Sequence, residues 1–166
     1  AVIKDKKASD WPGNYFDVDE VADARILIEH LLSLGHERIA IADWDSRGRL
    51  APETMSRYAL DILREKGLKI KEDWIIAVDP EHDPFYSELD FGRKVVRELL
   101  SLKSRPTAVM CSTDMIGMGV VNEAGKAGLK IGRDLAVTGN GNFEARSPEP
   151  VLTTLMESYS SIARAV

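Results

Sequence analysis

Apolar and polar residues follow two different periods along this chain. Four short runs are almost wholly apolar, which is typical of strands covered on both faces of a parallel sheet. They lie at residues 38–43, 74–78, 108–111 and 135–138. Between them, apolar residues recur in the manner of helices packed on one side, at residues 23–34, 53–66, 90–102 and 114–128. Strands that alternate with helices predict a mostly parallel α/β sheet with right-handed connections.

The third apolar run ends in three small polar residues, Ser112, Thr113 and Asp114, just before a helical pattern. Their side chains are suited to cap the first turn of that helix, where unpaired N–H groups attract polar ligand atoms. In open α/β sheets, ligands bind at the carboxyl ends of the strands. Thr113 and Asp114 are therefore the first candidates for ligand contact.

Four phrases of the sequence resemble, in order and spacing, the effector-binding core of LacI/GalR transcriptional regulators. They lie at residues 35–41, 106–119, 128–139 and 150–155, and the resemblance covers nearly the whole chain from about Tyr15. It implies a three-layer α/β/α, Rossmann-like lobe with a mostly parallel sheet. That lobe is of the type I periplasmic-binding-protein-like kind, and the second lobe is only partly present.

Members of this family begin with a helix-turn-helix module and the first half of an amino-terminal lobe, and neither is seen in this sequence. We therefore expect a fragment with three parts. Residues 1–18 are a remnant of the amino-terminal lobe and crossover, residues 19–150 form the effector-binding lobe, and residues 151–166 cross back toward the amino-terminal lobe. A chain of 166 residues is long enough to bury the core of one such lobe.

The resemblance also implies a polar effector held between the two lobes. Met55 stands where the family commonly has a bidentate Arg, and Arg57, two residues on, is expected to face elsewhere on the helix. Thr113-Asp114 stands for an Asn-Asp pair, and Gly141 or Asn142 for an Asp. These replacements argue against a standard hexose.

Aromatic rings and further polar groups complete the predicted site. Rings pack on apolar sugar faces, while carboxylates fix hydroxyl or amino groups, so the effector is expected to be a sugar, a sugar derivative or a cationic small molecule. The predicted effector-binding residues are Phe16, Asp17, Trp44, Met55, Phe85, Tyr86, Thr113, Asp114, Asn140, Asn142 and Glu157.

Several of these residues have an ordinary structural alternative. Asp114 can serve only as a helix-start residue, Met55 as core or cleft wall, and Trp44 as a core or edge aromatic. Gly117 and Gly119 are expected to let their helix approach the sheet closely.

Composition narrows the classes of function. The formal charge of −5 and the pI near 5.3 oppose direct DNA binding, because basic side chains must neutralise phosphates. No apolar stretch reaches membrane-spanning length and no signal-peptide core stands at the start, which agrees with a cytoplasmic domain. With no motif for a metal, a cofactor or a catalytic nucleophile, we expect no enzyme; the single Cys111 has no base nearby in sequence.

The leading hypothesis is a homodimeric regulator that senses a small molecule and reaches DNA through a module outside this sequence. The helix from Glu53 and the segment 89–100 are candidate dimer surfaces. Two alternatives remain open: a periplasmic-type solute receptor, and a family member that binds no small molecule and serves in dimerisation.

Overall fold

The computed structural model describes residues 19–44, 50, 52–78, 87–143 and 152–156. They form a five-stranded, wholly parallel sheet in the order β2-β1-β3-β4-β5. The strands are β1 (Ile39–Asp43), β2 (Ile75–Ala77), β3 (Ala108–Cys111), β4 (Ala136–Asn140) and β5 (Thr153–Leu155). The helices are α1 (Glu20–Ser33), α2 (Met55–Glu65), α3 (Glu88–Ser101) and α4 (Asp114–Lys126), with a single 3₁₀ turn, η2 (Glu72–Trp74).

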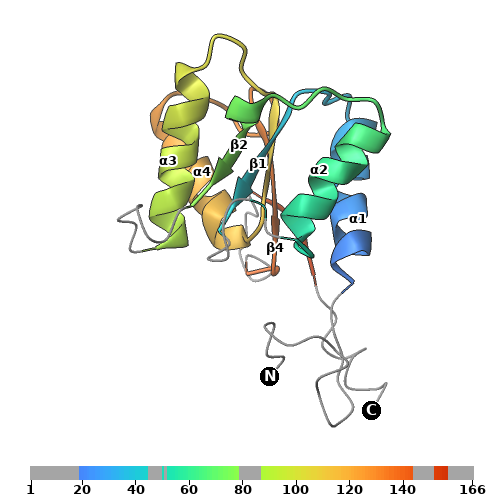
Figure 1. Cartoon of the computed structure of the whole chain (residues 1–166). Coiled ribbons are helices and arrows are strands. Elements are labelled where there is room, and N and C mark those ends of the chain that lie inside the picture. Colours follow the sequence, from blue (N-terminus) through green and yellow to red (C-terminus); the bar gives the residue numbers. More distant parts are fainter. Residues whose placement is uncertain (1–18, 45–49, 51, 79–86, 144–151, 157–166) are drawn as a thin grey trace.

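Helices α1 and α2 cover one face of the sheet, and α3 and α4 cover the other (Figure 1). Successive residues of a strand point to opposite faces. Accordingly Ile39 and Ile41 of β1 pack toward α1 and α2, while Ala40 and Ala42 pack toward α3 and α4. Every residue of β1 and β3 is buried, so the predicted parallel sheet with helices on both faces is confirmed.

The element boundaries correct the sequence interpretation in several places. Trp74 lies in the 3₁₀ turn before β2 rather than in the strand, with its indole N–H bonded to the carbonyl of Ser104. The helix expected from residue 53 begins at Met55, because Glu53 has a left-handed φ of 62°. The strand β5 was not predicted, since its three residues, Thr-Thr-Leu, are too few to show a period.

Two glycines set the spacing between α3 and α4. A Cβ atom on Gly92 would lie 2.9 Å from the Cα of Gly119 and would overlap the carbonyl oxygen of Ile116. A Cβ atom on Gly119 would overlap the carbonyl oxygen of Leu89. The expectation that Gly119 serves an approach to the sheet is therefore wrong, because its close neighbour is helix α3. Gly117 instead faces the side chain of Leu152, next to β5.

All four helices begin at the same edge of the sheet, which is the carboxyl edge in a parallel α/β layer. Each is capped by a side-chain oxygen that accepts the N–H of the residue three positions on. The capping residues are Asp19, Thr54, Ser87 and Thr113. This edge therefore gathers helix N-termini and strand ends, and it holds the candidate site. Within the described part of the chain, no helix is both long and apolar enough to cross a membrane.

Candidate functional site

Six of the predicted contact residues are described, and all six lie at the carboxyl edge. Trp44 follows β1, Met55 opens α2, and Thr113 and Asp114 join β3 to α4. Asn140 ends β4 and Asn142 stands in the turn after it. The other five lie outside the described residues: Phe16, Asp17, Phe85, Tyr86 and Glu157.

Thr113 joins the starts of two helices. Its Oγ1 accepts the N–H of Ile116 at 3.3 Å, which caps α4, and it donates its own hydrogen to Oε2 of Glu88. Glu88 is the first residue of α3 and is only partly buried, so its carboxylate stands at the edge as a hydrogen-bond acceptor. Glu88 is absent from the predicted contacts, because the apolar period predicts a helix that begins only near Asp90. The signal was present, since Ser87 followed by Asp90 at the third position is the pattern of a helix cap.

Trp44 is held from two sides. Its backbone N–H is accepted by Oγ of Ser112 at 3.1 Å, across from the end of β3. Its ring meets Phe91 edge to face, with ring centroids 5.6 Å apart and an interplanar angle of 69°. The ring is partly exposed, so it rests on the α3–α4 core while part of its surface reaches the carboxyl edge.

Asp114 is buried completely, with 0% of its surface exposed. Its Oδ2 accepts the N–H of Phe143 at 2.7 Å, and its Oδ1 accepts the hydroxyl hydrogen of Thr154 at 2.6 Å. Gly139 makes room for the carboxylate, because a Cβ atom there would overlap Oδ1. Both carboxylate oxygens are thus used inside the fold, which favours the structural alternative for this residue.

The end of β4 and the turn after it present groups of a different kind. Among the described residues, no donor meets the buried Oδ1 of Asn140, and an unmet acceptor costs free energy. Asn142 has a left-handed φ of 54°, a conformation that Asn tolerates better than most residues. Phe143 exposes 68% of its surface, and the sequence analysis did not single it out. A single aromatic residue in a polar turn gives no periodic signal.

Met55 belongs to the core under α1 and α2, with 5% of its surface exposed. Its backbone N–H is accepted by Oε2 of Glu20 at 2.5 Å, which ties the start of α2 to the start of α1. Arg57 faces solvent and pairs with Asp61 at 3.2 Å, so it does not replace the Arg that the family resemblance placed at Met55.

Cys111 is the residue of β3 that precedes this site, and it is completely buried. Burial raises the pKa of its thiol far above the ordinary range, and the charge of Asp114 raises it further. A thiol held in its protonated form is a poor nucleophile. Among the described residues, no group of three or more His, Cys, Asp and Glu side chains is placed to hold a metal ion.

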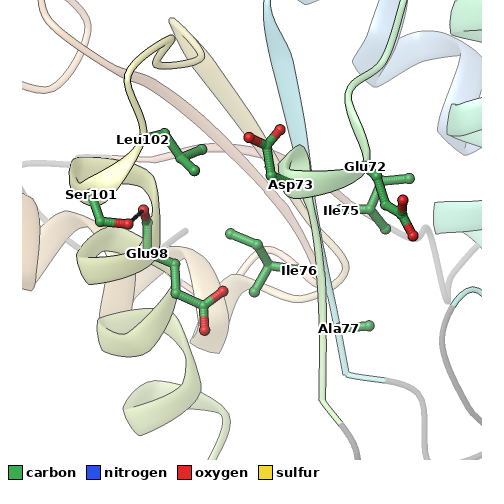
Figure 2. A pocket seen from close by; sticks show the side chains of 8 residues that line it. All are labelled: Glu72, Asp73, Ile75, Ile76, Ala77, Glu98, Ser101 and Leu102. Atoms are coloured by element: carbon green, nitrogen blue, oxygen red, sulfur yellow. Dashed lines mark hydrogen bonds between the residues drawn. The ribbon is translucent and has the colours of Figure 1, made fainter.

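A separate hollow of about 610 Å³ runs along the outer side of β2. Figure 2 shows Glu98 and Ser101 of α3, with Leu102 just after it, on one side of the hollow and Asp73 on the other. The side chain of Ile76 projects from β2 toward α3, whereas Ile75 and Ala77 lie on the other side of the strand. None of the six predicted contact residues that the structure describes lines this hollow. Its carboxylates give it an acidic rim, with Glu98 paired to Lys94 at 3.6 Å.

A sequence family described as periplasmic binding protein-like domain matches residues 28–166. The HTH-type transcriptional repressor PurR of Pasteurella multocida (strain Pm70) is 30% identical over 95% of this chain and 47% of its own length. The repressor of the same name from Photorhabdus laumondii is 37% identical over 58% of this chain and 26% of its own length.

Solved structures of LacI family regulators share the fold of this chain. A regulatory protein of the LacI family from Chloroflexus aggregans superposes with a TM-score of 0.77 at 28% identity, over 94% of this chain and 54% of that one. A LacI family regulator from Lactobacillus casei, solved with bound sucrose, has a TM-score of 0.73 at 24% identity, over 89% of this chain and 53% of that one. The chain spans about half the length of these proteins.

Proposed function

Because the chain belongs to the periplasmic-binding-protein-like family and corresponds to the effector-binding domain of LacI-type transcriptional regulators, we propose that it senses a small polar molecule at the carboxyl edge of its sheet. Binding there controls DNA binding by a module outside this sequence. The relatives named above are called repressors, which agrees with a role that is not enzymatic.

The observation that carries this proposal is the gathering of polar side chains at successive strand ends. Ser112 and Thr113 follow β3, Asn140 ends β4, and Glu88 joins them from the start of α3 through its bond with Thr113. Open α/β sheets bind their ligands at this edge. Trp44 and Phe143 add partly or largely exposed aromatic surface to the same edge.

The described groups indicate a ligand that donates hydrogen bonds. Glu88 offers a carboxylate, which only accepts hydrogen bonds, and Asn140 offers an amide oxygen that no donor among the described residues meets. Sugars, amino sugars and nucleosides supply O–H or N–H donors together with a face that packs on an aromatic ring. A sugar or sugar derivative is our first choice. Phe16, Asp17, Phe85, Tyr86 and Glu157 remain part of the proposed site as sequence-based expectations.

The proposed regulator is a cytoplasmic homodimer whose two lobes change orientation when the effector binds. Such coupling requires that the effector bind one orientation more tightly than the other. The apolar residues of α3 are used within the fold, against α4 and the sheet. A dimer surface on α2 or α3 would therefore use their outward charged faces, which carry Arg57–Asp61 and Arg93–Asp90 pairs.

One observation favours a second candidate, a domain that dimerises and binds no small molecule. Met55 is buried in the core where the family resemblance places an Arg, and Gly141 offers no side chain where it places an Asp. A periplasmic-type solute receptor is the third reading, and the sequence upstream of Ala1 decides it through a signal peptide or a helix-turn-helix.

Calorimetric titration of the intact protein with glucose, sucrose, glucosamine and adenosine separates the first two candidates. We expect one of these to bind, and Glu88→Gln to weaken that binding about tenfold, because a charged acceptor is lost. Glu98→Gln, at the hollow beside β2, is the matched control and leaves affinity unchanged. Heat signals at background level for all four compounds favour the ligand-free domain, and equal affinity in wild type and Glu88→Gln removes Glu88 from the site.

A further inference from the structure

A buried carboxylate joins three segments at the carboxyl edge: the start of α4, the turn after β4 (residues 141–143) and the strand β5. We propose that Asp114 is a positioning residue that, through Thr154, fastens this turn to β5, so that movement of β5 is passed to the effector edge. The proposal rests on the proposed function, because it describes how that same site is regulated.

The fastening is a chain of hydrogen bonds through one hydroxyl group. The N–H of Asn142 donates to Oγ1 of Thr154 at 3.1 Å, and that hydroxyl donates in turn to Oδ1 of Asp114 at 2.6 Å. The hydroxyl also lies 3.3 Å from the carbonyl oxygen of Leu155, but its single hydrogen favours the shorter bond to a carboxylate. The second carboxylate oxygen accepts the N–H of Phe143 at 2.7 Å. Two consecutive amides of the turn are therefore held by one carboxylate, one of them by way of β5.

The sheet register explains why this arrangement fits here. Gly139 pairs with Thr154 across β4 and β5, so the two residues lie side by side. Because Gly139 has no side chain, the carboxylate of Asp114 lies over it and reaches Thr154. The N–H of Gly141 donates to the carbonyl oxygen of Leu155 at 3.0 Å, which adds a backbone bond between the same two segments.

The surroundings make the fastening firm at one end. Asp114 is the first residue of α4, where the helix dipole favours a negative charge, and hydrogen bonds are stronger in its buried setting. Helix α4 itself is locked to α3 through Gly92 and Gly119. The start of α4 is therefore held in place by α3, and hydrogen bonds to Asp114 attach the turn and β5 to it.

The two attached segments have different proposed roles. The turn carries Asn142 and directly follows Asn140 of β4, and both are candidate effector contacts. Strand β5 lies within residues 151–166, the stretch predicted to cross back toward the other lobe. A shift of β5 displaces the Thr154 hydroxyl, and the amide of Asn142 then loses or regains its acceptor. The contact of Asn142 with the effector and the position of β5 are thus coupled through the hydroxyl group of Thr154.

Amide hydrogen exchange of the intact protein, followed by NMR, tests the fastening without any ligand. Thr154→Val removes the hydroxyl and keeps the shape, and we expect the Asn142 amide to exchange about fivefold faster while the amides of β1 and β3 keep their rates. Thr154→Ser restores the Asn142 rate. Thr153→Val, at the exposed neighbouring position, is the matched control and leaves that rate unchanged.

Three results overturn the proposal: an unchanged Asn142 rate in Thr154→Val, an equal acceleration in β1 and β3, or failure of Thr154→Ser to restore the rate. For any of glucose, sucrose, glucosamine and adenosine that binds the wild type, Thr154→Val should weaken binding about fivefold and Thr154→Ser should recover it. If Thr154→Val keeps the wild-type affinity although its Asn142 amide exchanges faster, the hydrogen bond exists but does not affect effector binding. If none of the four binds the wild type, the proposed function fails for these compounds, and the exchange rates alone decide the fastening.

Discussion

Glycines lie at two close contacts of the fold, but they face different neighbours. Gly92 and Gly119 lie where α3 meets α4, a contact named the helix seam below, and Gly139 and Gly141 lie at the end of β4 and in the turn after it. Gly92 and Gly119 face backbone atoms of the opposite helix, which have no room to move aside. Gly139 faces first the side-chain carboxylate of Asp114, while the Cα atom of Asp114 and Cδ2 of Leu152 each lie 3.0 Å from the place of a Cβ atom; Gly141 faces the ring of Phe143. Backbone against backbone gives a fixed joint, whereas a side chain against a glycine gives a contact that rotation about a bond can release. We therefore expect the contact between α3 and α4 to be rigid, and the contacts at the carboxyl edge to adapt by side-chain rotation.

The largest effect is expected at the helix seam. Gly92→Ala and Gly119→Ala each force a methyl group against a carbonyl oxygen, and we expect each to lower the free energy of unfolding by about 3 kcal/mol. Gly125→Ala, on the same helix α4, meets open space and should raise it by about 0.5 to 1 kcal/mol. Urea denaturation measures all three. If Gly92→Ala changes the free energy of unfolding by no more than Gly125→Ala does, then α3 and α4 can move apart at this contact and it is not rigid.

A smaller effect is expected at the end of β4, next to the turn. Gly139→Ala pushes the methyl group against Oδ1 of Asp114, and the carboxylate has to rotate away from Thr154. We expect a loss of about 2 kcal/mol in the same denaturation experiment, less than at the seam because a side chain gives way. The single Cys111 supplies an independent readout, since a buried protonated thiol reacts with a disulfide reagent only when the protein opens. A loss as large as that of Gly92→Ala would remove the distinction between the two regions.

The smallest effect is expected from a surface pair outside both regions. Hydrogen bonds from Arg133, and then from the backbone N–H of Lys130, lower the pKa of Asp134 to about 2. Because the folded pKa lies below the ordinary value, the stabilisation is present above pH 3.8 and is lost as the pH falls through about 2. NMR titration of the Asp134 carboxyl carbon should show a midpoint near 2, and Arg133→Gln should move it upward. A midpoint near 3.8 in the wild type contradicts this assignment.

The sequence predicts the fold where the signal is repeated and misses features that depend on single contacts. Four strands and four helices follow from the apolar runs and the helical period, because many residues contribute to each. The short strand β5 does not, since its three residues are too few to show a period. The carboxyl edge as the place of the candidate site was predictable from Thr113 and Asp114, which close a buried strand.

What each side chain does at that edge was less predictable. The burial of Asp114 depends on Gly139 and Thr154, which come 25 and 40 residues later in the chain. Glu88 reaches the edge only because α3 starts two residues before the expected position. Phe143 is exposed because the turn after β4 directs it outward, and nothing in the local sequence indicates that direction. Contacts between distant segments decide these roles, and a single sequence does not display them.

In the proposed function, the carboxyl edge and not the hollow beside β2 receives the small molecule. Amide chemical shifts of the intact protein, recorded during titration with glucose, sucrose, glucosamine and adenosine, test it most directly. We predict that a binding compound shifts the amides of residues 112–114 and 140–143 and leaves those of Glu72 to Ala77 in place. Shifts that concentrate at residues 72–77 and 98–102, with the amides of the carboxyl edge unmoved, would contradict the account.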